Sequence, residues 1–244
     1  MKKDTCFTVD EHRLKATLFY PDKMNPRNPG VLFIHGWTSS EENYARRAKP
    51  LAECGGICLT FDLRGHGHSE GDFEAFSRAA HLKDVLAAYD FLVSQEGVDR
   101  DRIGVCGTSY GGYLASILSS KRKVKWLALR VPALYKNDNF IVPTAKLIEK
   151  DPTVFGQSGI KPQDNLALQA ISNFDGNVLI IESQKDGRIP HATILNYIDS
   201  LRETSPLTYK IIEEADHSLS EEEWQLEFIR IITYWFGTNF SDIQ

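Results

Sequence analysis

A serine lies between two glycines in the stretch Gly107–Gly112, which reads Gly-Thr-Ser-Tyr-Gly-Gly. The stretch directly follows the apolar run 103–106 and directly precedes apolar residues at helical spacing, namely Leu114, Ile117 and Leu118. This strand-turn-helix setting suits a nucleophilic serine on a sharp turn, because the glycines at 107 and 111 let the backbone pack closely against its neighbours. We therefore predict that Ser109 is exposed at the carboxyl end of a sheet, beside the N–H groups of a helix.

Two further polar loops follow predicted strands. His35-Gly36-Trp37 comes directly after the run 31–34, and the loop 62–69 (Asp-Leu-Arg-Gly-His-Gly-His-Ser) comes directly after the run 57–61. Open α/β sheets bind their ligands at the carboxyl ends of parallel strands, so both loops are predicted at the ligand-binding edge. We expect Arg64 to tie its loop to the body of the protein rather than to contact a substrate.

The elements that must position these loops alternate between strands and helices. Continuous apolar runs indicate parallel strands covered by helices on both faces, and they occur at 31–34, 57–61, 103–106, 126–129 and 178–181. Apolar residues recur at helical spacing in 82–92, 194–201 and 224–235, and Ser77 and Pro190 are suited to begin the first two helices. Cys6–Tyr20 is predicted as an antiparallel edge hairpin. The proline-containing segment 131–175 interrupts the alternation and is predicted to be a lid.

The three loops, an aspartate after a later strand and a late histidine occur in the order of a known family. The sequence resembles the α/β-hydrolases over nearly its whole length, and it is most similar to the small serine esterase, dienelactone-hydrolase-like and serine-peptidase-like branches. The resemblance implies an α/β fold with a mostly parallel eight-stranded sheet and helices on both faces. It also implies a single domain of residues 1–244, with a short lid insertion at about residues 131–175.

A serine nucleophile needs a histidine as its base and a carboxylate to orient that histidine. Of the seven histidines, only His217 follows the last strand-like run, 207–213, and precedes the final helix. Ala215-Asp216-His217-Ser218 resembles the histidine loop of the family. His35, His66 and His68 are expected to have packing or turn roles, and we assign His12, His81 and His191 to the surface.

For the acid we favour Asp186, which follows the predicted strand 178–182 and precedes a helix. Its loop resembles the acid loop of the family. Asp216 is a rival, but neighbouring side chains on a turn seldom point at each other, and Asp175 and Glu182 are weaker rivals. The predicted triad is therefore Ser109, Asp186 and His217.

The negative oxygen of a tetrahedral intermediate needs preorganised donors. The backbone N–H of Tyr110, just after the nucleophile, is one predicted donor, and the resemblance implies the N–H of Trp37 as the other. We expect the side chains of Trp37, Tyr135, Phe140 and Phe155 to line a substrate pocket. Packing is an equal alternative for Trp37, and aromatic residues in a lid such as the other three more often only seal the lid onto the body.

These residues predict a serine hydrolase of the carboxylesterase type that cleaves small to medium esters through an acyl-enzyme. Two alternatives stay open. The Ser-Tyr-Gly-Gly turn is also typical of a peptidase or acyl-peptide hydrolase. Some proteins of this fold are instead non-catalytic ligand-binding proteins, although the presence of all three triad residues argues against that here.

Composition excludes other classes of function. The chain has 244 residues and a net charge of -5, which argues against a nucleic-acid partner. No window approaches the ~18 apolar residues of a membrane span, and no apolar stretch follows the first lysines, so we expect a cytoplasmic protein without a membrane partner. His66 and His68 lack a third ligand nearby, so neither a metal nor a cofactor is expected. The expected partner is a small-molecule ester, and the protein is expected to be a monomer or homodimer.

Overall fold

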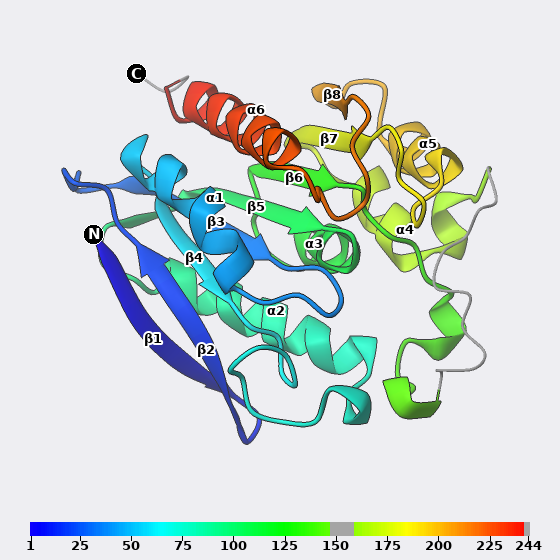
Figure 1. The fold of residues 1–244 in the computed structure, drawn as a ribbon, viewed down its shortest axis with the longest axis horizontal. Coiled ribbons are helices and arrows are strands. Elements are labelled where there is room, and N and C mark those ends of the chain that lie inside the picture. Colours follow the sequence, from blue (N-terminus) through cyan, green and yellow to red (C-terminus); the bar gives the residue numbers. More distant parts are fainter. Residues whose placement is uncertain (147–158, 242–244) are drawn as a thin grey trace.

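Eight strands form one sheet in the order β1-β2-β4-β3-β5-β6-β7-β8 (Figure 1). The computed structural model describes residues 1–146 and 159–241. The strands are β1 Lys2–Val9, β2 His12–Phe19, β3 Asn28–Ile34, β4 Ile57–Phe61, β5 Val98–Thr108, β6 Trp126–Arg130, β7 Asn177–Ser183 and β8 Leu207–Ile212. β3 to β8 are all parallel to their neighbours within this group, whereas β1 and β2 form an antiparallel hairpin at one edge. The predicted edge hairpin and mostly parallel eight-stranded sheet are confirmed.

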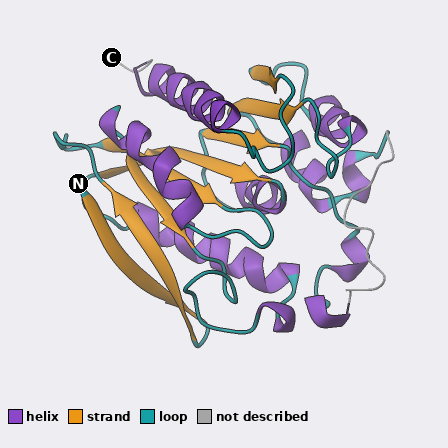
Figure 2. Ribbon diagram, viewed as in Figure 1, coloured by secondary structure: helices purple, strands orange, loops and turns teal. Residues whose placement is uncertain are grey.

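Helices cover both faces of the sheet, as predicted (Figure 2). The α-helices are α1 Glu42–Glu53, α2 Arg78–Val93, α3 Tyr110–Ser119, α4 Leu166–Ser172, α5 His191–Ser200 and α6 Glu222–Ser241. α2, α3, α4 and α5 pack on one face, and α1 and α6 pack on the other. α1 has no counterpart among the predicted helices.

Alternate residues of the central strands supply the two cores. In β3, Leu32 and Ile34 point toward the four-helix layer, whereas Val31 and Phe33 point toward α1 and α6. All four side chains are buried. Burying a large aliphatic or aromatic side chain contributes about 1.5–3 kcal/mol, so continuous apolar strands of this kind fix the centre of the sheet between two helical layers.

The segment 131–175 leaves the carboxyl end of β6 and returns to β7. Its described part includes 3₁₀ turns at Asn137–Asn139, Thr144–Lys146 and Pro162–Asp164, followed by α4. The Asn165 side chain caps α4 by accepting from the N–H groups of Ala167 and Leu168. α4 packs against α3 and therefore belongs to the helical layer, while the role of the segment as a lid stays a prediction.

Candidate active site

Ser109 occupies a strained turn between β5 and α3. Its φ is 53° and its ψ is -115°, a conformation that residues other than glycine rarely adopt. A Cβ atom at position 107 would lie 2.4 Å from the carbonyl oxygen of Gly111, and one at position 111 would lie 2.2 Å from that of Ile34. The two glycines are therefore required by close backbone approach, as the sequence predicts.

Backbone hydrogen bonds hold this turn in place. The Ser109 N–H donates to the carbonyl oxygen of Arg130 at 2.9 Å, and the Ser109 carbonyl accepts from the N–H groups of Ala133 at 3.0 Å and Tyr113 at 3.1 Å. The serine is thus tied to the end of β6, to the segment that follows it and to the first turn of α3. Such anchoring compensates the strain and keeps the backbone of the turn in one conformation.

Asp186 lies in the loop after β7, and its side chain is only 2 % exposed. Its Oδ1 accepts from the N–H groups of Arg188 at 2.7 Å and Ile189 at 2.8 Å, and its Oδ2 lies 2.7 Å from His217 Nδ1. Burial by itself raises the pKa of Asp186, but the hydrogen bonds from His217 and the two N–H groups outweigh it and hold the pKa below its usual value. The carboxylate is therefore ionised at neutral pH.

His217 lies in the loop between β8 and α6. Its side chain is 14 % exposed, and its carbonyl oxygen accepts from Nη2 of Arg130. Because Nδ1 donates to Asp186, the other ring nitrogen is left to act on a neighbour. The structure thus brings Asp186 and His217 into direct contact, and His217 and Ser109 line the same cavity.

The carboxylates considered as alternatives to Asp186 either bind other groups or lie away from His217. Asp216 accepts from the N–H and the hydroxyl of Ser220. Glu182 binds His191 and the Tyr209 hydroxyl, and Asp175 is exposed before the start of β7, at the end of the strand away from the loop that carries Asp186.

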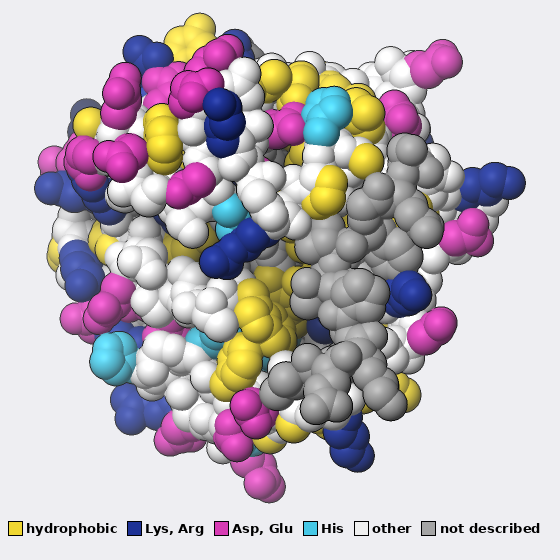
Figure 3. Space-filling model, turned by 45° about the vertical axis from the view of Figure 1, so that its right-hand side comes forward, with side chains coloured by type: hydrophobic (Ala, Val, Ile, Leu, Met, Phe, Trp, Pro, Cys, Tyr) yellow, Lys and Arg dark blue, Asp and Glu magenta, His cyan; other side chains and the backbone are white. Residues whose placement is uncertain are grey.

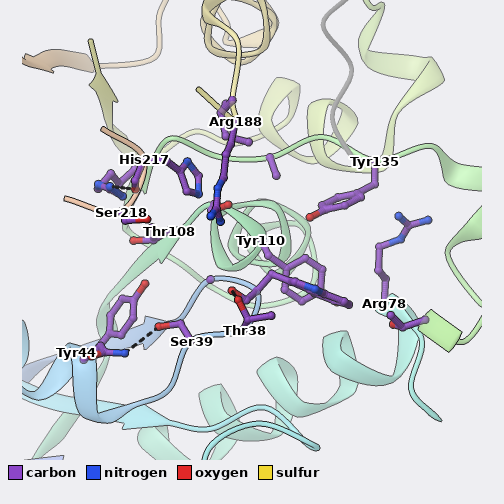
Figure 4. Close-up of a pocket in the computed structure, with 18 of the residues that line it drawn as sticks. Thr38, Ser39, Tyr44, Arg78, Thr108, Tyr110, Tyr135, Arg188, His217 and Ser218 are labelled. Carbon is purple, nitrogen blue, oxygen red and sulfur yellow. Dashed lines mark hydrogen bonds between the residues drawn. The ribbon is translucent and has the colours of Figure 1, made fainter. Parts of the chain in front are cut away.

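The cavity has a volume of about 810 Å³ and lies at the carboxyl ends of the parallel strands. In Figure 3, hydrophobic side chains gather near the middle of this face, with a basic and a histidine side chain beside them. In the close-up, Tyr44, Thr108, Ser218 and His217 lie on one side and Arg78 and Tyr135 on the other, with Arg188 reaching between them (Figure 4). Among the described residues, four arginines and no carboxylates line the cavity, the arginines being Arg47, Arg78, Arg130 and Arg188.

Two of the four side chains predicted to line the pocket do line the cavity. Trp37 and Tyr135 line the cavity, and the Tyr110 ring makes edge contacts with both, at centroid distances of 4.7 Å and 5.7 Å. Phe140 is not among the lining residues. It is half-buried against the core, and its carbonyl oxygen accepts from Ala79 N–H because this part of the chain packs on the start of α2. Phe155 lies outside the described residues.

Three imidazole rings pack behind the cavity, around the loop that carries Trp37. The His35 and His66 centroids are 5.0 Å apart, and those of His66 and His81 are 5.3 Å apart. His35 donates from Nδ1 to the Gly36 carbonyl and accepts the Leu63 N–H at Nε2. His81 donates from Nε2 to the Arg64 carbonyl and accepts from the Tyr110 hydroxyl at Nδ1.

The assignment of His81 to the surface is wrong, because its side chain is fully buried. Burial, with a smaller contribution from charge on His66, lowers the pKa of His35 and that of His81 to about 3. Burial also lowers the pKa of His66. All three rings are therefore neutral at neutral pH.

We expect acidification to destabilise the fold through these rings. An unfolded histidine binds a proton near pH ~6.5, whereas His35 and His81 in the folded protein do so only near pH 3. Lowering the pH from about 7 to about 5 therefore costs about 2 kcal/mol of unfolding free energy for each ring. Urea denaturation across this range should show the loss. His81→Gln should flatten the pH dependence, and a slope equal to that of the unaltered protein would contradict the assignment.

Arg64 does not line the cavity and ties its loop to the body of the protein, as predicted. Its Nε donates to Asp84 Oδ1 at 2.7 Å, and its Nη1 donates to Asp10 Oδ2 at 3.1 Å. Its own N–H also donates to Asp84 Oδ2 at 3.0 Å. The loop 62–69 is therefore joined to α2 and to the β1–β2 hairpin.

Comparison with known families supports the same picture. The sequence profile of the prolyl oligopeptidase family matches residues 42–242, which is most of the chain and includes Ser109, Asp186 and His217. The chain belongs to the prolyl oligopeptidase family. It is an α/β-hydrolase, and the family is one of serine hydrolases.

Two relatives match the chain over only part of their own length. An uncharacterized 31.7 kDa protein in the traX-finO intergenic region of Escherichia coli is 27% identical over 152 residues, which cover 60% of this chain and 52% of that protein. Acylamino-acid-releasing enzyme 1 of Oryza sativa is 23% identical, covering 92% of this chain but 32% of that enzyme. The chain thus spans about half or less of these two relatives.

One solved structure matches this fold over nearly the full length of both chains. Est1E from Butyrivibrio proteoclasticus, determined with bound ferulic acid, superposes with a TM-score of 0.74 at 18% identity, covering 98% of each chain. At this identity the likeness concerns the fold alone.

Within residues 1–146 and 159–241, no helix combines the length and apolar character of a membrane crossing. In the same part of the chain, no cluster of three or more histidine, cysteine, aspartate or glutamate side chains is arranged to hold a metal ion.

Sequence reasoning missed the arginines of the cavity. Arg130 offers the clearest signal, because it is a charged residue at the carboxyl end of an otherwise apolar strand. Arg47 gives none, since an arginine on a charged helix is ordinarily a solvated side chain.

Proposed function

We propose that the protein is a carboxylesterase-type serine hydrolase that cleaves small to medium carboxylic esters through Ser109, His217 and Asp186, without a metal or a cofactor. The observation that carries this proposal is the 2.7 Å contact between His217 Nδ1 and Asp186 Oδ2, beside the cavity that Ser109 lines. The contact engages one nitrogen of the ring with an ionised acid. The other nitrogen is then available to a serine hydroxyl.

In the proposed reaction, Ser109 Oγ attacks the acyl carbon while His217 accepts the hydroxyl proton. His217 then gives this proton to the departing alcohol, and an acyl-serine remains. Water, deprotonated by the same ring, hydrolyses the acyl-serine and regenerates the enzyme. Asp186 holds the tautomer of His217 and stabilises the charged ring in both steps.

The proposed oxyanion hole consists of the backbone N–H groups of Tyr110 and Trp37. Tyr110 is the first residue of α3, where an N–H has no partner within the helix. Neither N–H donates to another described residue, so both are available to a developing negative oxygen. Removing one donor of this kind costs about 3 kcal/mol of activation free energy.

The cavity supports an ester of modest size. Its volume of about 810 Å³ falls in the range of small-molecule sites, and Trp37 and Tyr135 supply apolar walls. Esters of ferulic acid, the compound bound in the Est1E structure, are therefore suitable test substrates for a pocket with these aromatic walls.

A fluorophosphonate probe tests the proposal directly. The probe reacts with a serine only where a neighbouring base activates it, so we expect stoichiometric labelling at Ser109, located by peptide mass spectrometry. Labelling should be accompanied by hydrolysis of p-nitrophenyl butyrate. A protein that stays unlabelled and inactive would instead favour the non-catalytic, ligand-binding alternative.

A peptidase or acyl-peptide hydrolase is the second candidate. It is favoured by the family match and by the similarity to an acylamino-acid-releasing enzyme over 92% of this chain. Comparing kcat/KM for acetyl-alanine p-nitroanilide with that for p-nitrophenyl butyrate distinguishes the two. Turnover of the anilide at a rate like that of the ester would favour the peptidase.

A further inference from the structure

Two arginines lie at the end of the cavity that contains Tyr44. Arg47, on α1, has its guanidinium carbon 4.3 Å from the Tyr44 ring centroid and 5.1 Å from that of Phe228. Arg130, at the end of β6, has its guanidinium carbon 5.6 Å from the same Phe228 ring. Both arginines line the cavity, so two positive charges face one apolar ring beside the candidate active site.

Neither arginine has an acidic partner among the described residues. Arg46, Arg64 and Arg122 form ion pairs with Glu222, Asp84 and Asp90, respectively, whereas Arg47 and Arg130 lie within 4 Å of no described carboxylate. Arg130 is only 2 % exposed. Its Nη2 donates to the His217 carbonyl, and its Nε has no acceptor.

The positive charges of Arg47 and Arg130 are therefore not neutralised by any described carboxylate within 4 Å. Burial, with a smaller contribution from the charge of Arg47, lowers the pKa of Arg130 to about 10, while Tyr44, Asp186 and Asp216 act in the opposite direction, the two carboxylates from outside ion-pair distance. A buried charge without a partner is costly, so a negative group brought into this end of the cavity would be stabilised. The whole chain has a net charge of -5, so the positive charge at this end of the cavity does not follow from the overall composition.

Neutral hydrogen-bonding groups lie beside the two arginines. Thr108 is the register partner of Arg130 across β5 and β6, and its buried hydroxyl has no hydrogen-bond partner among the described residues. Ser218 and Tyr44 line the same side of the cavity (Figure 4). Two guanidinium groups with hydroxyls around them are the donor set that binds carboxylates.

We propose that Arg47 and Arg130 form a carboxylate-binding subsite, so that the preferred substrate is an ester that carries a second, ionised carboxyl group. The proposal rests on the proposed esterase function and names the substrate class of that site. Arg47 is the residue to vary, because Arg130 also holds the loop of His217. Arg46 is the matched control, since it lies next to Arg47 on α1 but pairs with Glu222 outside the cavity.

Two pairs of esters test the subsite. Mono-p-nitrophenyl glutarate and p-nitrophenyl hexanoate differ by a carboxylate on the acyl side, and 4-acetoxybenzoate and its methyl ester differ by a carboxylate on the alcohol side. In at least one pair we expect kcat/KM to favour the charged ester tenfold or more. R47Q should lower that ratio at least tenfold, R47K should lower it less, and R46Q should leave it within twofold.

The outcomes separate this inference from the esterase proposal. Preference for the neutral ester in both pairs, or an unchanged ratio in R47Q, would overturn the subsite while leaving the esterase intact. If the protein hydrolyses none of these esters, a ligand-binding measurement tests the subsite instead. In the Ser109→Ala protein, 4-phenylbutyrate should raise Tm and 4-phenylbutanamide should not, and Arg47→Gln should abolish the rise. Equal effects of acid and amide would also overturn the subsite.

Discussion

Replacement of Ser109 by alanine is expected to lower kcat/KM for p-nitrophenyl butyrate by about 10⁵-fold or more. Without the hydroxyl no acyl-enzyme forms, and only substrate binding and the N–H donors of Tyr110 and Trp37 remain to assist attack by water. The variant should fold normally, because the backbone bonds that fix the turn do not involve the side chain. Stopped assays with chromatographic detection of p-nitrophenol would measure the residual rate.

Ser94→Ala is a suitable control for this experiment. Ser94 ends α2, and its hydroxyl donates to the Phe91 carbonyl away from the cavity. The activity of the Ser94→Ala protein should equal that of the unaltered protein. Retention of more than about one hundredth of the activity by Ser109→Ala would assign the nucleophile elsewhere.

Asp186→Asn is expected to lower kcat by about 10⁴-fold near neutral pH. The amide oxygen still accepts the N–H groups of Arg188 and Ile189, so the loop keeps its shape. The amide nitrogen, however, donates to His217 Nδ1 and forces the proton onto the other ring nitrogen, which then cannot accept one from Ser109. Steady-state rates together with the circular dichroism spectrum separate a catalytic loss from misfolding.

Asp216→Asn provides the matched comparison. Asp216 precedes His217 in sequence, but its carboxylate binds Ser220, so the substitution should change kcat less than about threefold. A loss confined to Asp216→Asn would reverse the assignment of the acid.

The sheet and the serine turn could be predicted from sequence because each depends on local pattern. Apolar runs such as 31–34 are buried on both faces, and the glycines at 107 and 111 meet neighbouring backbone at distances that exclude a side chain. The contact between Asp186 and His217 depends on strand order as well, since β7 and β8 must be adjacent and parallel to bring the two loops together. Only the family resemblance supplied that order.

Other features could not be predicted from the sequence, because they depend on contacts with residues distant in sequence. α1 is rich in charged residues and contains Pro50, a residue that ordinarily ends a helix, so no helix is predicted there, yet Tyr44, Ala48 and Leu51 share one face and pack against the sheet. His81 is buried on the inner face of α2 because Tyr110 and the Arg64 carbonyl supply its hydrogen bonds. A periodicity based on apolar residues alone cannot find a buried polar side chain whose partners come from elsewhere.

The neutral imidazoles behind the cavity simplify the enzymology. His35, His66 and His81 contact the loops that carry Trp37 and Tyr110, and burial lowers the pKa of each ring, to about 3 for His35 and His81. Neither His35 nor His81 therefore contributes an ionisation to a rate profile measured between pH 5 and pH 9. A kinetic titration in this range is free of these two rings, even though both pack directly behind the cavity.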